Sequence, residues 1–316
     1  HDIPGVEIAV FYPTGGTSEI QRLQMATQEG ENVAVYAVRG NFDDAQTGVK
    51  KVFGDKDIAA KLAERNIRLS SANSINWGRL VPQIVYYFAA YAQLLKAEKI
   101  AFGDKVDFCV PTGNFGDILA GYYAKRMGLP VGKLVCASNE NNVLTDFLTT
   151  GTYTAKREFF KTTSPSMDIL VSSNLERLLY HVTGSDAEVA GFMKSLAETG
   201  SYTVRPETLA AIQESFGCGW SSEAEVAGEI KARYEQDGYL CDTHTAVAFH
   251  VAAREKQAGV PMVVLSTASP FKFPRSVLEA LGYTAPENDF EAMQALEAAT
   301  HHTAPASLAA LRRKTE

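Results

Sequence analysis

Short apolar runs rich in β-branched residues alternate along this chain with stretches of helical spacing, and this alternation restricts the possible folds most. Strands joined through helices pair most readily as a parallel sheet with right-handed crossovers. The sequence therefore predicts an α/β fold with helices on both faces of a parallel sheet. Strands are expected at residues 6–12, 32–38, 66–70, 106–110, 134–137 and 262–265.

Length and charge narrow the class of protein further. The 316 residues correspond to about two domains at ~150 residues each. The net charge of −7 argues against a nucleic-acid partner, which requires a basic face. The most apolar stretch, residues 80–95, is interrupted by Pro82 and two glutamines, so we expect a buried helix and no membrane span.

The cysteines point to a structural role in a reducing compartment. Cys109, Cys136, Cys218 and Cys241 lie far apart and form no CxxC pair, so neither a disulfide framework nor a metal site is expected. Free buried thiols are typical of cytoplasmic proteins.

The sharpest local signal is a strand, a glycine-bearing turn and a helix start in succession, VDFCVPTGNFGDILAGYY at residues 106–123. Gly113 and Gly116 flank the turn, and a helix is expected from about Asp117. Such a turn lets backbone N–H groups approach an anion at a helix N-terminus. It matches neither GxGxxG nor GxxxxGK[ST], and a tight turn without a ligand accounts for the spacing equally well.

Polar residues also follow two other expected strands. Ser74, Asn76 and Arg79 come after residues 66–70, where they could bind a phosphate or carboxylate, or cap a helix beside a surface arginine. Thr267 and Lys272 follow residues 262–265. This threonine could bond a ring nitrogen and this lysine an anion, although a capping threonine and a surface lysine fit the pattern better.

Two further polar stretches receive no firm role. Asn139–Asn142 follows the strand at 134–137 and could line a cleft together with the polar residues that follow the other strands. A histidine at a helix start, such as His244, is more often structural. Residues 155–237 contain more charge and several Gly/Ser/Thr breaks, so we expect an elaboration packed onto the sheet.

Seven segments together resemble the threonine synthase family, whose members are pyridoxal-phosphate (PLP) enzymes of fold type II. They occur in family order and span most of the chain. The segments are GGTSEIQRLQMATQEGENVAVYAV, GNFDDAQTGVKK, SANSINWGR, VPTGNFGDILAGYYAKRMGLP, ASNENNVLTDFLTTGTY, DTHTA and STASPFKFP.

The resemblance implies PLP as cofactor and O-phospho-L-homoserine as substrate, converted with water to L-threonine and phosphate. Thr267 would face the pyridine nitrogen. The turn that would hold the PLP phosphate consists of Gly113, Asn114, Phe115, Gly116 and Asp117. The residues that would contact the substrate are Ser74, Asn76, Arg79 and Lys272.

One departure from the family is that its lysine-bearing His-Gly-Pro-Thr-x-x-Phe-Lys-Asp segment does not occur in these residues. We therefore expect a C-terminal part of a threonine synthase that is inactive by itself. Residues 1–66 would be the remnant of a small α/β domain, and 67–316 the large PLP domain. We expect a monomer or homodimer. A threonine dehydratase-like or cysteine synthase-like enzyme and a non-catalytic metabolite-binding module remain alternatives.

Overall fold

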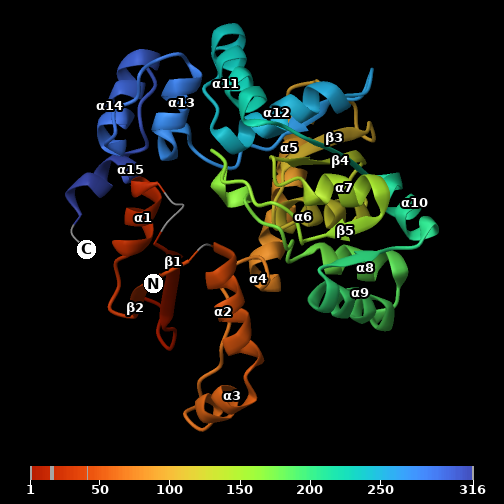
Figure 1. Cartoon of the computed structure of the whole chain (residues 1–316). Coiled ribbons are helices and arrows are strands. Elements are labelled where there is room, and N and C mark those ends of the chain that lie inside the picture. Colours follow the sequence, from red (N-terminus) through yellow and green to blue (C-terminus); the bar gives the residue numbers. More distant parts are fainter. Residues whose placement is uncertain (1, 15–17, 41, 315–316) are drawn as a thin grey trace. The chain divides into compact units, whose positions relative to one another are not determined.

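The computed structural model describes residues 2–14, 18–40 and 42–314, and the chain divides into two compact units (Figure 1). Unit 1 comprises residues 1–70, 230–243 and 268–316, and unit 2 comprises residues 71–229 and 244–267. The division at residue 66 stays a prediction; in the structure, residues 230–243 and 268–316 group with the N-terminal residues.

Unit 2 contains the larger sheet and the helices that cover it. Its strands are β3 (Val106–Pro111), β4 (Val131–Ser138), β5 (Thr152–Thr154), β6 (Ser201–Thr203), β7 (Phe216–Trp220) and β8 (Met262–Val264). Its helices are α4 (Trp77–Leu80), α5 (Ile84–Lys96), α6 (Gly116–Arg126), α7 (Val143–Thr150), α8 (Leu175–Thr183), α9 (Asp186–Thr199), α10 (Pro206–Ser215) and α12 (Thr243–Glu255). Helix α11 (Glu223–Asp237) continues the chain from unit 2 into unit 1.

The sheet of unit 2 confirms the predicted α/β architecture. Four parallel strands lie in the order β7-β4-β3-β8, so sequential strands are joined by crossovers rather than hairpins. Strands β5 and β6 form a separate antiparallel pair. Because all four strands of the larger sheet run the same way, the loops that follow them meet at one edge.

Alternate side chains of the central strands enter different layers of the core. Phe108 and Val110 of β3 join an apolar cluster with residues of α5, α6 and α7. Cys109 between them approaches α12, where its Sγ lies 3.2 Å from the carbonyl oxygen of Ala248. Figure 1 shows α12 on one side of β3 and β4, with α6 and α7 on the other.

Two sequence expectations about strands are wrong. Residues 66–70 form no strand, and Ile67 and Leu69 are exposed, because this segment joins none of the sheets in the part of the chain that the structure describes. Conversely, the glycine-rich FGCGW at 216–220 lies within the region expected to elaborate the sheet, yet it forms β7 beside β4. Gly219 fits there because a Cβ would lie 2.8 Å from Val251 Cγ1 of α12.

The apolar stretch at 80–95 is only partly the buried helix that was expected. Helix α4 ends at Leu80, a short 3-10 helix follows over Val81–Gln83, and α5 begins at Ile84. Pro82 cannot donate the backbone hydrogen bond that a continuous helix needs. Tyr87 is buried, whereas Val85 and Tyr86 are 62% and 57% exposed.

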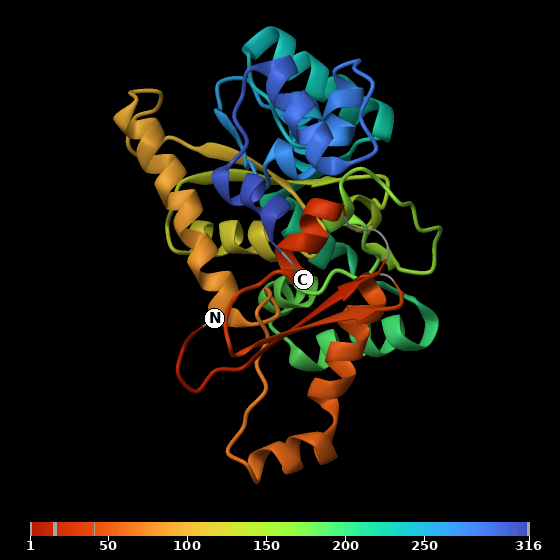
Figure 2. The ribbon, with the colours of Figure 1, turned by 90° about the vertical axis from the view of Figure 1, so that its left-hand side faces the viewer.

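Unit 1 contains a smaller sheet and its own helices. Its strands are β1 (Ile8–Pro13) and β2 (Val33–Val38), which pair in parallel and lie side by side in Figure 2. Its helices are α1 (Glu19–Ala26), α2 (Phe42–Gly54), α3 (Lys56–Ala63), α13 (Pro274–Ala280), α14 (Asp289–Thr300) and α15 (Ala306–Ala310).

A capping box marks the start of helix α1. Ser18 and Gln21 form it, each side chain bonding the other's backbone N–H. The backbone N–H of Glu19 donates to Asp289 at the start of α14, 2.7 Å away, which links two distant segments of unit 1.

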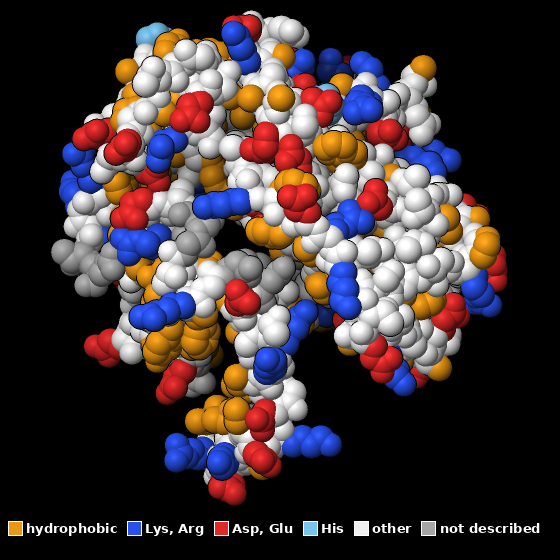
Figure 3. All heavy atoms as spheres, in the orientation of Figure 1, with side chains coloured by type: hydrophobic (Ala, Val, Ile, Leu, Met, Phe, Trp, Pro, Cys, Tyr) orange, Lys and Arg blue, Asp and Glu red, His pale blue; other side chains and the backbone are white. Residues whose placement is uncertain are grey.

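One face of the small sheet is apolar and open. Phe11 of β1 and Tyr36 of β2 stack with their ring centroids 5.2 Å apart, and about half of each side chain is exposed. Figure 3 shows apolar side chains gathered over these strands. Among the described helices, none combines the length and apolarity needed to cross a membrane.

Helix α6 approaches its neighbours so closely that Gly121 leaves no room for a side chain. A Cβ there would lie 2.6 Å from the ring of Tyr87 and 2.7 Å from Leu134. We predict that Gly121→Ala lowers the free energy of unfolding by ~1–3 kcal/mol through overpacking, measured by urea denaturation.

Gly191 supplies the matched control for this prediction. It lies within α9, and a Cβ there would meet nothing within 4 Å. Gly191→Ala should raise the free energy of unfolding by about 1 kcal/mol through helix propensity. Equal effects of the two substitutions would contradict the close approach at Gly121.

Candidate functional site

The turn after β3 lies at the carboxyl edge of the larger sheet and leads directly into α6. Phe115, the residue before α6, has φ +63°, a left-handed conformation that costs about 1–2 kcal/mol for a non-glycine residue. Its ring is fully buried and lies 5.6 Å from the ring of Phe216. Burial of a phenylalanine contributes about 1.5–3 kcal/mol, enough to hold the backbone in this conformation.

The two glycines of this turn are required by close neighbours. At Gly113 a Cβ would lie 3.0 Å from the Cα of Met167, and at Gly116 it would lie 2.7 Å from Ser74 Oγ. The backbone N–H of Gly116 donates to Asn114 Oδ1 at 2.9 Å. The turn thus joins backbone N–H groups to the start of an eleven-residue helix, an arrangement that can stabilise an anion.

A second segment, at the start of α8, holds this turn in place. Asn174 donates from both its backbone N–H and its Nδ2 to the carbonyl oxygen of Asn114, at 3.1 and 2.9 Å. Ser172 Oγ donates to the carbonyl oxygen of Gly113 at 2.8 Å. Sequence reasoning missed both residues, because an Asn before a helical pattern resembles an ordinary N-cap.

The backbone and the side chain of Asp117 both contact Tyr87 of α5. The hydroxyl of Tyr87 donates to the Asp117 carbonyl oxygen at 2.8 Å and lies 3.1 Å from its Oδ1. Burial raises the pKa of the Asp117 carboxyl to about 6, although the bond from Tyr87 acts in the opposite direction. The carboxyl is therefore uncharged over part of the acidic range, which reduces its repulsion of a nearby anion.

The structure brings one of the three polar residues after position 70 to the turn. Ser74 lies against Gly116, whereas Asn76 caps α4 by accepting from the N–H of Gly78 at 2.9 Å. The Nε of Arg79 donates to the carbonyl oxygen of Ala72, and this side chain is exposed.

Thr267 and Lys272 lie in different units. Thr267 follows β8, which pairs with β3, so its exposed side chain is at the same sheet edge as the turn. Its N–H donates to Thr245 Oγ1 at 3.3 Å. Lys272 belongs to unit 1, where its carbonyl oxygen accepts from Ser18 Oγ, and burial lowers the pKa of its amine.

The polar residues after β4 form a buried cluster that holds the loop at 160–168. Asp168 Oδ1 accepts from Asn139 Nδ2 at 2.8 Å, from Asn141 Nδ2 at 3.0 Å and from Thr162 Oγ1 at 2.7 Å. Nε2 of His244 accepts from the N–H of Ser166 at 3.2 Å. The polar groups at this edge of the sheet therefore support the loop at 160–168.

Comparison with known proteins agrees with this geometry. Residues 245–314 match a family model described as "Threonine synthase, C-terminal". The chain is 42% identical over 284 residues to human threonine synthase-like 1, covering 89% of this chain and 38% of that protein. It is 40% identical over 301 residues to threonine synthase of Schizosaccharomyces pombe, covering 87% of this chain and 57% of that protein.

A solved structure matches nearly all of the chain. The PLP-bound threonine synthase of Brucella melitensis superposes with a TM-score of 0.81 and 41% identity, over 98% of this chain and 61% of that one. The chain therefore has the fold of the fold type II, PLP-dependent enzymes. Its sequence is similar to those of threonine synthases, and it spans less than two thirds of the length of these relatives.

The burial of Asp117 predicts a dependence of stability on pH. Because its pKa is raised from about 4 to about 6 on folding, its contribution is greatest below pH 4 and is lost as the pH rises through 6. We predict that the unfolding free energy of wild type minus that of Asp117→Asn falls between pH 4 and pH 7. The subtraction removes the other titrating groups, and a difference independent of pH would contradict the assignment.

Proposed function

We propose that this chain carries the cofactor-phosphate and substrate-binding part of a threonine synthase. The proposed reaction converts O-phospho-L-homoserine and water into L-threonine and phosphate. One observation carries the proposal: the turn at 113–117 has the geometry of an anion site, in a chain 41% identical to a PLP-bound threonine synthase of the same fold.

The residues at this turn fit the phosphate of PLP. Gly113 and Gly116 let the backbone of the turn pass close to Met167 and Ser74, and α6 supplies the favourable end of its dipole. The Ser74 hydroxyl lies at the same place and can donate to a phosphate oxygen. Asn114 and Phe115 would contribute backbone N–H groups, while Asp117 would support the turn through Tyr87.

We propose that Thr267 contacts the opposite end of the cofactor. It follows β8, the neighbour of β3, and a hydroxyl there can hydrogen-bond a pyridine nitrogen. When bound, PLP would draw electrons from the amino-acid substrate, and a neutral hydroxyl partner would tune that property less strongly than a carboxylate.

The substrate carries a second phosphate, for which cations are needed. Arg79 is exposed and Lys272 is half-buried, and both remain our candidates for contacts with the substrate phosphate or carboxylate. Asn76 is a weaker candidate, because its Oδ1 caps α4 and its Nδ2 donates to the carbonyl oxygen of Ser71 at 2.8 Å.

The same proposal also predicts the ligands, the cellular compartment and the oligomeric state. The ligands are small molecules, with no nucleic-acid or membrane partner, and we propose a cytoplasmic monomer or homodimer. The four cysteines are free thiols, consistent with a reducing compartment.

We propose that these 316 residues alone are inactive, because the family's lysine-bearing segment is not among them. Incubation with PLP followed by borohydride should leave less than stoichiometric cofactor on lysine, measured by mass spectrometry of peptides. Lys272→Ala serves as the control, since burial lowers the pKa of this amine and makes it the best accidental target. Stoichiometric trapping at one lysine would overturn the proposed inactivity.

The proposed reaction is tested with protein purified from its natural source. We expect O-phospho-L-homoserine to yield equimolar threonine and phosphate, quantified by chromatography and a phosphate assay. Formation of a 2-oxo acid from threonine would instead identify a dehydratase-like enzyme. Binding without turnover would identify a metabolite-binding relative, and either result would refute the proposal.

A further inference from the structure

The phosphate turn and the segment at 72–76 are separate in the sequence, yet one side chain joins them. Asn174, before α8, has no exposed surface. Its Nδ2 lies 2.9 Å from the carbonyl oxygen of Asn114 and 3.0 Å from Ser74 Oγ. A single buried amide therefore bridges the turn and the serine that faces it.

The side chain of Asn174 does not cap α8. It occupies the N-cap position of α8, but its side chain makes no capping bond to that helix. Its Oδ1 instead accepts from Arg177 Nη1 at 2.7 Å. The oxygen of the amide thus bonds a side chain of α8, which fixes the nitrogen end toward Asn114 and Ser74.

Arg177 extends the same connection into the backbone before α4. Its Nη1 also donates to the carbonyl oxygen of Ser74 at 2.8 Å, and its Nη2 donates to that of Ile75. A planar guanidinium can meet several acceptors in fixed directions, which a lysine cannot. Arg177 therefore fixes both Asn174 and the main chain that carries the Ser74 hydroxyl.

We propose that Asn174 and Arg177 are positioning residues that hold the Ser74 hydroxyl and the turn at 113–116 in register for one phosphate group. The inference rests on the proposed function and deepens it, because it names the residues on which recognition of the PLP phosphate depends. Neither side chain need touch the cofactor. Their effect is to fix donors before the ligand arrives, which reduces the ordering cost of binding.

The test compares the affinities of the whole chain for pyridoxal 5′-phosphate and for pyridoxal, which lacks the phosphate. Wild type should prefer the phosphorylated form. Asn174→Ala removes two donated bonds, so its affinity for pyridoxal 5′-phosphate should fall about tenfold while that for pyridoxal stays unchanged. Arg177→Lys should lower the same preference, because it loses the bridging geometry.

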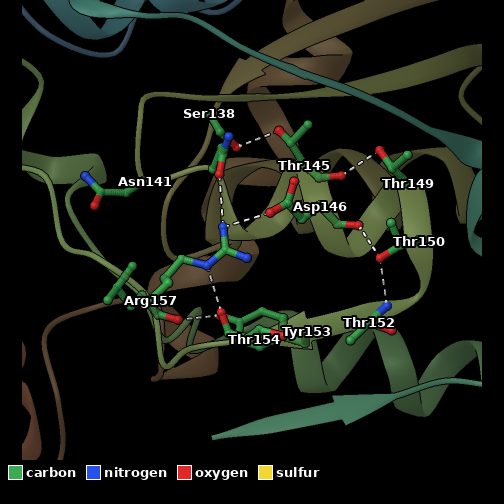
Figure 4. Close-up of polar contacts among 12 residues, drawn as sticks. Ser138, Asn141, Thr145, Asp146, Thr149, Thr150, Thr152, Tyr153, Thr154 and Arg157 are labelled. Atoms are coloured by element: carbon green, nitrogen blue, oxygen red, sulfur yellow. Dashed lines mark hydrogen bonds and ion pairs between the residues drawn. The ribbon is translucent and has the colours of Figure 1, made fainter.

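Arg157 supplies a matched control within unit 2. Its Nε donates to the carbonyl oxygen of Thr154 at 2.9 Å, and its Nη1 pairs with Asp146 at 2.8 Å (Figure 4). It therefore also braces backbone and a side chain, but away from the phosphate turn. Arg157→Lys should lower thermal stability without changing the preference for pyridoxal 5′-phosphate over pyridoxal.

Hydrogen exchange of the unliganded chain gives an independent measurement. Asn174→Ala and Arg177→Lys should speed amide exchange at 113–117 and at 74–78 together, whereas Arg157→Lys should leave both segments unchanged. Arg177→Lys keeps the test available should Asn174→Ala not fold.

The outcomes separate the two levels of the proposal. A wild-type chain with no preference for the phosphorylated form overturns the proposed cofactor site, and this inference with it. A wild-type preference that survives unchanged in Asn174→Ala and Arg177→Lys overturns the positioning role alone. Loss of preference in the Arg157→Lys control as well would also refute it, since the effect would then follow general destabilisation.

Discussion

The burial of the Phe115 ring is the constraint on which the rest of the site depends. The ring lies fully within the core beside Phe216 of β7, while its own backbone adopts a left-handed conformation. The chain can then turn sharply from β3 into α6, whose first backbone N–H, that of Gly116, donates to Asn114 Oδ1. A core contact thus determines the course of a polar turn.

Polar residues follow three neighbouring strands of the larger sheet, and their roles differ from one strand to the next. After β4, Asn139 and Asn141 bond Asp168 and thereby hold a long loop, so these amides are already committed. After β3, the turn itself is supported from α8 by Asn174. After β8, Thr267 remains exposed at the same edge. The polar residues at neighbouring strand ends of this sheet therefore differ in how far they are committed to supporting loops.

Much of the fold could be predicted because its signals are local. The strand at 106–110, the capping box at Ser18 and the turn glycines depend on short-range patterns of burial, capping and backbone conformation. Strand β7 was missed, since FGCGW lacks a strand's usual side chains and is held by pairing with β4. Residues 66–70 have strand-like composition but pair with none of the described strands, and they are irregular.

The sequence by itself determined the α/β class, the resemblance to threonine synthases and the succession of strand, glycine-bearing turn and helix at 106–123, because these follow from periodicity and contiguous motifs. Only the tertiary structure decided which polar residues meet that turn. It placed Ser74 against Gly116, used Asn76 as a cap, and brought Asn174 across sixty residues to the Asn114 carbonyl. Such contacts depend on how distant segments pack, and hydrogen bonds between residues far apart in sequence leave no spacing in the chain to reveal them.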